Sequence, residues 1–431
     1  MMDISDLYNE FLASGGVCTD TRTLWEGQLF FALKGESFDG DSFVAQALEK
    51  GARLAVASQA CPLDDPRIVK VPDTLRCLQE LAAHHRRQLH IPVIGLTGTN
   101  GKTTTKELIR CTLAQRYRVR ATQGNLNNDI GVPLTVLGIQ ADDEIAIVEM
   151  GASHPEDLRP LLAVAQPTHG LITNVGKAHL LGFGSYEGVK HAKGLLYDWL
   201  IAHGGTIFAH AADPVLAGML AERGASDVVR YGEEGARVLP ASPLQPYLRL
   251  RLGRDMLETQ LVGAYNTPNI LAALCVGAFF GVPKTRCRAA ISAYVPSNNR
   301  SQLVRTERNT LIVDAYNANP SSMAVALDNL ALCEGRKVAL LGDMRELGAD
   351  AAAEHRKVVE RLLTVIPGEA GGWSAFLVGE EFAKAAQGTS LPVFPSSEAL
   401  ADYLKAHPLQ GCTILVKGSR GIQMEKVIAS L

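Results

Sequence analysis

The middle of the chain alternates short apolar runs with longer segments of helical periodicity. The apolar run 93–96 predicts a buried strand, and the segment 105–113 behind it predicts a helix. Further short apolar runs predict strands, at 119–121, 144–149, 170–173 and 206–209. Over residues 89–296 this alternation is typical of a doubly wound parallel sheet.

The segments on both sides of this central part show the same alternation. In residues 1–88 the runs 27–33 and 53–58 predict strands and 42–50 predicts a helix, so we expect a small α/β domain. In residues 297–431 four more strands are expected, at 310–314, 336–341, 375–378 and 413–416. The chain is therefore expected to hold three domains, 1–88, 89–296 and 297–431.

Composition narrows the class of protein. A net charge of −3 argues against a nucleic-acid-binding face, and the eight cysteines form no C-x-x-C pair, as expected in a reducing cytosol. The first ten residues show no signal-peptide pattern, and the longest apolar run, 270–282, is too short for a membrane span. We expect a cytoplasmic enzyme with no membrane span and no nucleic-acid partner.

The turn after the first central strand has a phosphate-binding pattern. Gly98 and Gly101 let backbone N–H groups converge on an anion, Lys102 would reach the β- and γ-phosphates, and the Thr103 hydroxyl would bind Mg²⁺. The turn is shorter than the general G-x-x-x-x-G-K-[ST] pattern, because Leu96 stands where the first glycine is expected. An ordinary glycine turn is the alternative. The expected nucleotide contacts of the loop are Gly98, Thr99, Asn100, Gly101, Lys102, Thr103 and Thr104.

Polar residues stand at other strand ends, where ligands of parallel sheets bind. Glu149 closes an apolar strand and suits a metal or water ligand better than a surface carboxylate. Asn125, Asn127 and Asn128 offer amide donors and acceptors in one loop, with a plain turn as the alternative. In the first domain, 20–22 combines a carboxylate, a hydroxyl and a guanidinium, which suits a phosphate-bearing ligand or a solvated loop.

One helix carries a lysine on its apolar side. Ser185 is a plausible N-cap of a helix over 186–201, and Lys193 lies within its apolar stripe, between Val189 and Leu196. Such a lysine either snorkels to water or has a function.

Three polar clusters follow strands of the third domain. They are 314–320, 342–348 and 417–421, and they predict a second ligand-binding face at the carboxyl ends of those strands.

On these motifs the chain resembles the Mur ligases of bacterial cell-wall synthesis over essentially its full length. Its phosphate loop is similar to the one that Mur ligases share with folylpolyglutamate synthases, and the stretches 125–128, 314–320, 341–348 and 417–420 are more specific. The resemblance implies three α/β domains: a small UDP-binding domain, a central P-loop parallel-sheet ATPase domain and a C-terminal Rossmann-like ligase domain. It also implies ATP and Mg²⁺ as cofactors.

The sequence Asp-x-Tyr-Asn-Ala-Asn-Pro at 314–320 resembles the dipeptide-adding member of this family. It implies that ATP, through an acyl phosphate, drives amide formation between UDP-N-acetylmuramoyl-tripeptide and D-alanyl-D-alanine in peptidoglycan precursor synthesis, and we expect a monomer. The alternatives are a Mur ligase that adds a single amino acid, a P-loop ATPase that acts as a switch, and a UDP-sugar-binding protein without catalysis. Intact Lys102, Thr103, Glu149, His179 and Lys193 argue against the last.

The resemblance also implies roles for single residues. The expected catalytic residues are Lys102, His179, Lys193 and Arg300. The expected Mg²⁺ environment is Thr103, Glu149, His179 and Lys193, the last as a carbamate. Further nucleotide contacts are Asn269, Arg300 and Asp314. The expected substrate contacts are Asp20, Thr21, Arg22, Lys34, Asn125, Asn127, Asn128, Tyr316, Asn317, Asn319, Asp343, Lys417 and Ser419.

The chain departs from the family pattern at three places. Tyr265 replaces a histidine, Asn299 replaces a glycine, and 211–213 replaces a more polar motif that contains asparagine. These departures bear on individual nucleotide contacts and leave the class of enzyme unchanged.

Overall fold

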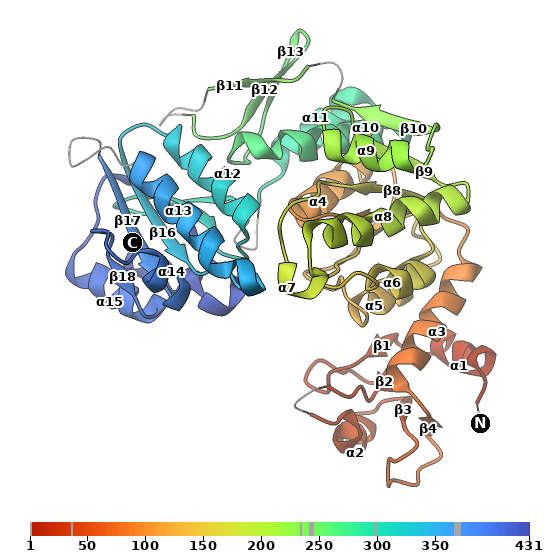
Figure 1. Ribbon diagram of the computed structural model, residues 1–431. Helices are drawn as coiled ribbons and strands as arrows, with labels where there is room; N and C mark the ends of the chain where they lie inside the picture. Colours follow the sequence, from red (N-terminus) through yellow and green to blue (C-terminus); the bar gives the residue numbers. More distant parts are fainter. Residues whose placement is uncertain (1, 36–37, 233–234, 241–244, 297–299, 366–371) are drawn as a thin grey trace.

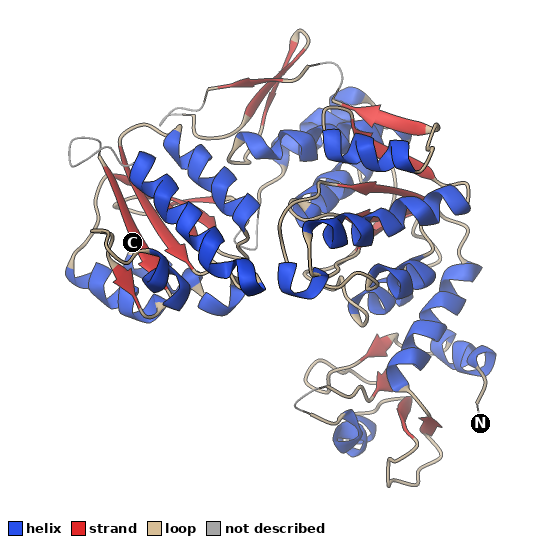
Figure 2. Cartoon of the chain, in the orientation of Figure 1, coloured by secondary structure: helices blue, strands red, loops and turns tan. Residues whose placement is uncertain are grey.

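The computed structural model describes residues 2–35, 38–232, 235–240, 245–296, 300–365 and 372–431. Asn299, which replaces a glycine of the family pattern, lies outside these residues. Figure 1 and Figure 2 show three α/β parts that follow one another along the chain, as predicted.

The first part is a four-stranded parallel sheet in the order β1-β2-β3-β4. Its strands are β1 (Val17–Cys18), β2 (Leu29–Phe31), β3 (Leu54–Ser58) and β4 (Ile68–Val71). Its helices are α1 (Ile4–Leu12), the 3₁₀ turn Gly40–Phe43, α2 (Val44–Glu49) and α3 (Thr74–Gln88). The strands predicted at 27–33 and 53–58 are confirmed in shortened form, because Gly27 and Gln28 belong to the preceding turn.

Helix α3 joins the first part to the second. Its side chains Leu78 and Leu81 are fully buried, and they belong to one apolar cluster with Phe11 of α1, Val136 of α5 (Gly131–Leu137) and Leu161 of α6 (Leu158–Ala165). In Figure 1, α3 lies between the first sheet and the pair α5 and α6. One continuous core therefore crosses residue 88.

The central part is built on a six-stranded parallel sheet in the order β10-β9-β8-β5-β7-β6. The strands are β5 (Val93–Thr97), β6 (Val119–Ala121), β7 (Ile145–Glu149), β8 (His169–Ile172), β9 (Thr206–His210) and β10 (Val228–Tyr231). The remaining helices are α4 (Lys102–Leu113), α7 (Leu180–Phe183), α8 (Tyr186–Ala202), α9 (Pro214–Glu222), the 3₁₀ turn Ala264–Asn266, α10 (Thr267–Phe279) and α11 (Lys284–Ala293). The predicted doubly wound sheet is confirmed, with β5 buried at its centre.

Three details of the central part differ from the prediction, and the first is β10, where no strand was expected. Helix α4 begins at Lys102 rather than at residue 105, although threonine is a weak helix former. It forms there because the Thr103 and Thr105 hydroxyls bond to Glu149 and Asn269. A small antiparallel sheet, β11-β12-β13, also interrupts the expected alternation. Its strands are Arg237–Leu239, Arg249–Leu252 and Asp255–Glu258.

The third part is a six-stranded sheet in the order β14-β15-β19-β16-β17-β18, with β14 antiparallel to the rest. Its strands are β14 (Gln302–Arg305), β15 (Thr310–Asp314), β16 (Arg336–Gly342), β17 (Trp373–Val378), β18 (Val393–Phe394) and β19 (Cys412–Lys417). Its helices are α12 (Pro320–Ala331), α13 (Ala351–Val365), α14 (Glu380–Ala385) and α15 (Ser397–Ala406), with 3₁₀ turns at Gly348–Asp350, Arg420–Ile422 and Met424–Ser430. The four predicted strands are all present.

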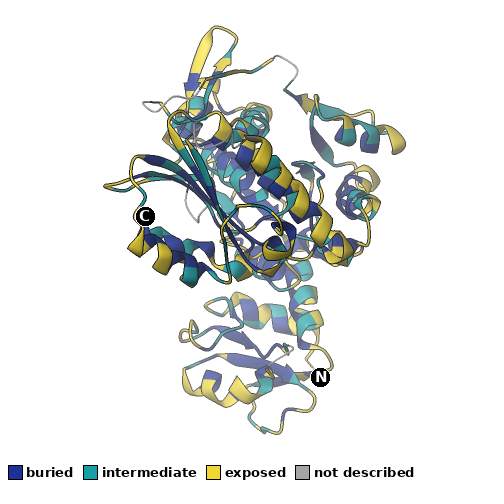
Figure 3. Ribbon diagram, turned by 60° about the vertical axis from the view of Figure 1, so that its left-hand side comes forward, coloured by how far each residue is buried: buried dark blue, intermediate teal, exposed yellow. Residues whose placement is uncertain are grey.

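Burial follows this layered arrangement. In Figure 3 buried residues line the strands and the inner faces of the helices, while exposed residues lie on the outer faces. In the described part of the chain, no helix combines the length and the apolar character that a bilayer crossing requires.

Candidate active site

The phosphate loop connects β5 to the N-terminus of α4. Gly98 and Gly101 have φ of +144° and +78°, in the region that favours glycine. A Cβ atom on Gly98 would lie 2.0 Å from the Thr173 hydroxyl oxygen, and one on Gly101 would lie 2.8 Å from Asn269 Oδ1. The loop therefore depends on both glycines, and it places the partial positive charge of a twelve-residue helix where an anion can bind.

Lys102 lies folded over this loop. Its Nζ donates to the carbonyl oxygens of Gly98 (2.7 Å) and Thr99 (3.1 Å). Burial lowers the pKa of Lys102 to about 8; the Glu149 carboxylate opposes this shift and the Arg300 guanidinium adds to it. A phosphate in the loop would offer Lys102 a charged partner in place of two neutral carbonyls.

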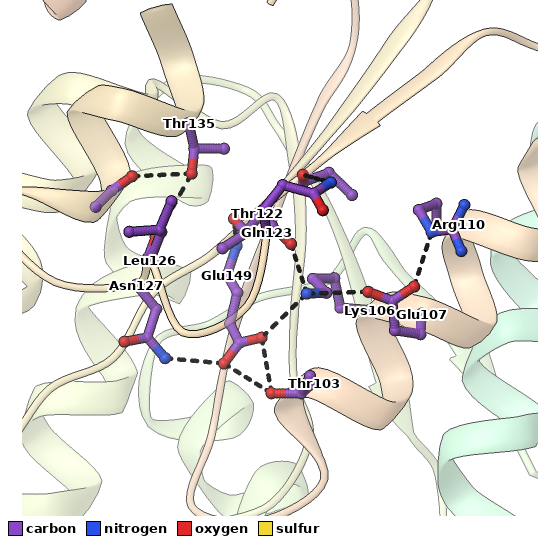
Figure 4. A network of polar contacts seen from close by, with 12 residues as sticks. Thr103, Lys106, Glu107, Arg110, Thr122, Gln123, Leu126, Asn127, Thr135 and Glu149 are labelled. Atoms are coloured by element: carbon purple, nitrogen blue, oxygen red, sulfur yellow. Dashed lines mark hydrogen bonds and ion pairs between the residues drawn. The ribbon is translucent and has the colours of Figure 1, made fainter. Parts of the chain in front are cut away.

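Glu149 ends β7 beside the first turn of α4, and only 1% of its surface is exposed. The Thr103 hydroxyl lies 3.2 and 3.1 Å from its two carboxylate oxygens, and Asn127 Nδ2 donates to Oε1 at 2.9 Å (Figure 4). Mg²⁺ prefers oxygen ligands and is commonly held by one or two carboxylates together with substrate phosphates. The donor set of Thr103 and Glu149 fits that pattern. No cluster of three or more His, Cys, Asp or Glu side chains suited to a metal occurs in the described ranges.

A buried lysine that the sequence analysis missed lies against the same carboxylate. Lys106 Nζ is 4.0 Å from Glu149 Oε2, 2.5 Å from the carbonyl oxygen of Thr122 and 3.1 Å from Glu107 Oε1. Thr122 also accepts the Glu149 backbone N–H through its hydroxyl, at 2.9 Å. The sequence offered one signal, a second lysine one turn after Lys102.

His179 lies at the boundary with the third part of the chain. Its Nδ1 pairs with the carboxylate of Glu346, and its φ is +51°. Burial lowers the pKa of His179, and the charge of Glu346 opposes that shift. Among the described contacts, no hydrogen bond or ion pair links His179 to Thr103 or Glu149. The structure therefore places His179 near the phosphate loop, within reach of the third part.

Lys193 lies inside α8, as its place in the apolar stripe predicted. Only 2% of Lys193 is exposed, so the amine cannot snorkel to water. Its Nζ donates to the Ala152 carbonyl oxygen at 3.5 Å and lies 5.5 Å from the centre of the Phe183 ring. Burial holds the pKa of Lys193 well below its ordinary value, the charge of Lys102 lowers it further, and Asp157 opposes both.

Asn269, an expected nucleotide contact, is held in place by two neighbouring side chains. Asn269 Oδ1 accepts from the Thr105 hydroxyl at 3.0 Å, and its Nδ2 donates to Asn266 Oδ1 at 2.9 Å. The Tyr265 hydroxyl donates to Ser301 Oγ at 2.6 Å. Tyr265 thus ties the central part to the residue after Arg300.

The three polar clusters of the third part meet at one sheet edge, because β15, β19 and β16 are neighbours. Lys417 is 1% exposed, and its Nζ lies 2.5 Å from Asp314 Oδ2 and 3.2 Å from the Asn317 carbonyl oxygen. Ser419 Oγ accepts the Arg345 backbone N–H at 2.8 Å. The Arg300 guanidinium lies 3.7 Å from the centre of the Tyr316 ring and covers it.

The Asp343 side chain bonds to the N-terminus of α14. Its carboxylate accepts the backbone N–H groups of Glu381 (3.0 Å) and Phe382 (2.9 Å) at the start of α14. Each oxygen therefore accepts one hydrogen bond from the helix, and the substrate contact expected of Asp343 stays a prediction.

Asn319 links the third part to the phosphate loop. Its Oδ1 accepts the Ser322 N–H at 2.9 Å and caps α12, while its Nδ2 donates to Asn100 Oδ1 at 2.8 Å. A second contact across this boundary joins Lys177 to Glu354 at 3.1 Å. Glu346 belongs to the predicted polar cluster 342–348, but its pairing with His179 was not predicted, and Glu354 was missed. No local pattern shows which loops of two domains will meet.

A single cavity of about 1040 Å³ collects most of the expected site. The predicted residues that line it are Thr99, Asn100, Gly101, Lys102, Thr104, Asn127, Asn128, Glu149, His179, Asn269, Arg300, Asp314, Tyr316, Asn317, Asn319 and Lys417. Its wall therefore comes from both the central and the third parts of the chain.

Four of the expected substrate contacts lie in the first part and do not line this cavity. Asp20 forms a 2.6 Å ion pair with Arg22, whose hydrogen bonds lower the pKa of Asp20 to about 2. Thr21 donates to Gln46 Oε1 at 2.8 Å, and Lys34 lies 3.7 Å from Asp39. Arg22 and Lys34 are exposed and Asp20 is half-buried, whereas Thr21 is buried. In Figure 1 the first sheet, which carries this part, lies apart from β8 and α4 of the central part.

Comparison with known proteins places these features in one family. Three family models match in order: "Mur ligase family, catalytic domain" at residues 15–86, "Mur ligase middle domain" at 96–277 and "Mur ligase, glutamate ligase domain" at 299–420. The UDP-N-acetylmuramoyl-tripeptide–D-alanyl-D-alanine ligase of Bacillus subtilis is 33% identical, over 96% of this chain and 93% of that protein.

Two solved structures extend the likeness to the fold. MurF from Acinetobacter baumannii has a TM-score of 0.85 and 30% identity, and the match covers 96% of this chain and 92% of that one. MurF ligase from Thermotoga maritima, solved in complex with ADP, has a TM-score of 0.81 and 26% identity, with 100% and 98% covered.

Proposed function

The chain belongs to the Mur ligase family, and we propose that it is the ATP-dependent ligase that joins D-alanyl-D-alanine to UDP-N-acetylmuramoyl-tripeptide in peptidoglycan precursor synthesis. The observation that carries the proposal is the shared cavity, in which the phosphate loop faces the clustered strand ends of the third part. A ligase needs this arrangement, because it must align a phosphoryl donor with both a carboxylate and an amine.

In the proposed reaction the tripeptide carboxylate attacks the γ-phosphorus of ATP, and ADP leaves. The D-alanyl-D-alanine amine then attacks the carbonyl carbon of the acyl phosphate, and phosphate leaves. Lys102 and Arg300, which both line the cavity, would balance the negative charge that develops on the transferring phosphoryl group. Thr103 and Glu149 would hold Mg²⁺, which supplies charge neutralisation and alignment of the phosphate oxygens when bound.

We assign Lys193 a role as a carbamate. Its burial and lowered pKa favour the neutral amine, which can add CO₂ to give an anion with two oxygen acceptors. Such an anion would attract a second Mg²⁺, whereas the ammonium would repel it. His179, beside the same loop, would complete this environment once a nucleotide is bound.

The remaining proposed contacts come from all three domains, 1–88, 89–296 and 297–431. Asp20, Thr21, Arg22 and Lys34 would bind the uridine nucleotide, and Asn125, Asn127 and Asn128 would lie along its peptide. Tyr316, Asn317, Asn319, Lys417 and Ser419 would form the D-alanyl-D-alanine side. We propose a monomer in the cytoplasm, a compartment with which the free state of the described cysteines agrees.

The decisive experiment measures ADP and product formation from ATP and UDP-N-acetylmuramoyl-tripeptide, with and without D-alanyl-D-alanine. The proposal expects steady ADP release and a UDP-N-acetylmuramoyl-pentapeptide only when the dipeptide is present. Equal phosphate release without an acceptor amine would indicate an ATPase switch, and turnover with single amino acids instead would indicate another Mur ligase.

A further inference from the structure

Lys106 lies one turn after Lys102 in α4, and it is unusual because a charged side chain is there only 1% exposed. A buried ammonium is stable only where acceptors surround it. Lys106 has three: the Thr122 carbonyl oxygen at 2.5 Å, Glu107 Oε1 at 3.1 Å and Glu149 Oε2 at 4.0 Å. The reaction proposed above uses none of these contacts.

The three groups around the Glu149 carboxylate approach from different directions (Figure 4). Asn127 holds Oε1, Lys106 lies against Oε2, and Thr103 lies near both oxygens on the side of the phosphate loop. The backbone of Glu149 is fixed separately, since its N–H donates to the Thr122 hydroxyl. Thr122 therefore connects Lys106 and Glu149 through its two oxygens.

We propose that Lys106 is a positioning residue for the metal site: its ammonium, anchored on Thr122, holds the Glu149 carboxylate in the orientation that receives Mg²⁺ beside Thr103. This inference rests on the proposed function, because it assumes the metal site of Thr103 and Glu149. Partners that orient a metal ligand typically account for about 10- to 100-fold in metal affinity.

The charge of Lys106 by itself would lower the affinity for Mg²⁺, because a nearby cation repels the metal ion. Glu107 limits this repulsion, since it forms a 3.1 Å ion pair with Lys106 on the side facing away from Glu149. Orientation is therefore expected to outweigh repulsion. The two effects predict opposite changes in Mg²⁺ affinity, which makes the proposal testable.

The test compares Lys106→Met with Arg110→Met. Arg110 is a matched control, since it is a cation one turn further along α4, pairs with the same Glu107 at 2.7 Å and is 41% exposed. For each protein, calorimetry gives the ADP dissociation constant with and without Mg²⁺. The ratio of the constant without Mg²⁺ to the constant with Mg²⁺ measures how much the metal strengthens ADP binding. This ratio is insensitive to a general loss of stability. The readout needs no turnover.

Lys106→Met should reduce this ratio by about 10-fold or more relative to wild type, with ADP affinity in the absence of Mg²⁺ changed by less than about twofold. Arg110→Met should keep the wild-type ratio, and Lys106→Arg should restore most of it. In turnover assays the Mg²⁺ concentration needed for half-activation should rise in Lys106→Met while kcat at saturating Mg²⁺ falls less.

An unchanged ratio in a folded Lys106→Met protein overturns the proposal and leaves a purely structural lysine, and a larger ratio overturns it in favour of simple repulsion. If Lys106→Met does not fold, the test uses Lys106→Gln instead, because glutamine keeps a hydrogen-bond donor for Thr122. Failure of both to fold also overturns the proposal. If wild type itself shows no Mg²⁺ effect on ADP binding, the proposed function fails instead.

Discussion

The buried amine of Lys193 allows a direct test of the proposed carbamate. Two substitutions separate the possibilities: Lys193→Arg keeps a permanent cation, and Lys193→Met keeps the approximate length without a charge. Arginine cannot lose its proton in a protein and cannot form a carbamate. The folded Lys193→Arg enzyme should therefore lose at least about 100-fold in kcat, the usual loss when one charge-stabilising group is removed.

The stability effect follows from the pKa of Lys193. Because the folded protein holds this amine neutral, the unfolded chain binds one more proton below the ordinary pKa of 10.5, and wild-type stability rises with pH in that range. The slope is about 1.4 kcal/mol per pH unit for one proton. Lys193→Met removes this term, so its stability advantage over wild type should shrink as pH rises toward 10.5, by at most about 1.4 kcal/mol per pH unit.

Denaturant unfolding in CO₂-free buffer at several pH values measures this slope, and steady-state ADP release with and without added bicarbonate measures the carbamate. Wild-type turnover should slow when CO₂ and bicarbonate are removed and should recover when bicarbonate returns, whereas Lys193→Met should not respond. Normal turnover of Lys193→Arg would refute the carbamate. A pH-independent stability difference between Lys193→Met and wild type would refute the neutral amine.

Two further predictions concern the phosphate loop. Lys102→Ala should fold normally but lose turnover, and since burial lowers the pKa of Lys102 to about 8, kcat/KM for ATP should fall as pH rises above about 8. Lys102→Arg should remove that decline; an identical decline in the variant would assign it to another group. Asn319→Asp keeps the cap of α12 but loses the donor to Asn100, so KM for ATP should rise about 2- to 10-fold with an unchanged melting temperature. An unchanged KM would show that this contact does not assist ATP binding.

The elements that the sequence predicted well are those whose local pattern and tertiary setting agree. Buried parallel strands such as β5 and β7 are short apolar runs closed by glycine or a carboxylate, and both boundaries fell within a residue or two. Ser185 caps α8 as predicted, because its hydroxyl accepts the Gly188 N–H. The inward direction of Lys193 followed from helical spacing alone.

The elements that the sequence did not predict depend on distant partners or on a weak pattern. Lys106 is polar on an amphipathic helix, and its burial and its bond to the distant Thr122 carbonyl could not be read from the sequence of α4. The pairing of His179 with Glu346 depends on how two domains face each other. The β12–β13 hairpin had a readable signal, alternating Arg and Leu before the Gly253–Arg254 turn, that the expectation of a continuous parallel sheet obscured.

The apolar core that crosses residue 88 determines where this chain can be recombined with its relatives. Leu78 and Leu81 of α3 interlock with Val136 and Leu161, so a chimera joined at 88/89 would set a foreign helix face against native α5 and α6. Close-packed interiors tolerate such mismatched shapes poorly. The cores around Leu327 and Val416, by contrast, draw almost wholly on residues after 300. Chimeras between family members should therefore exchange residues 1–296 as one segment and residues 297–431 as another.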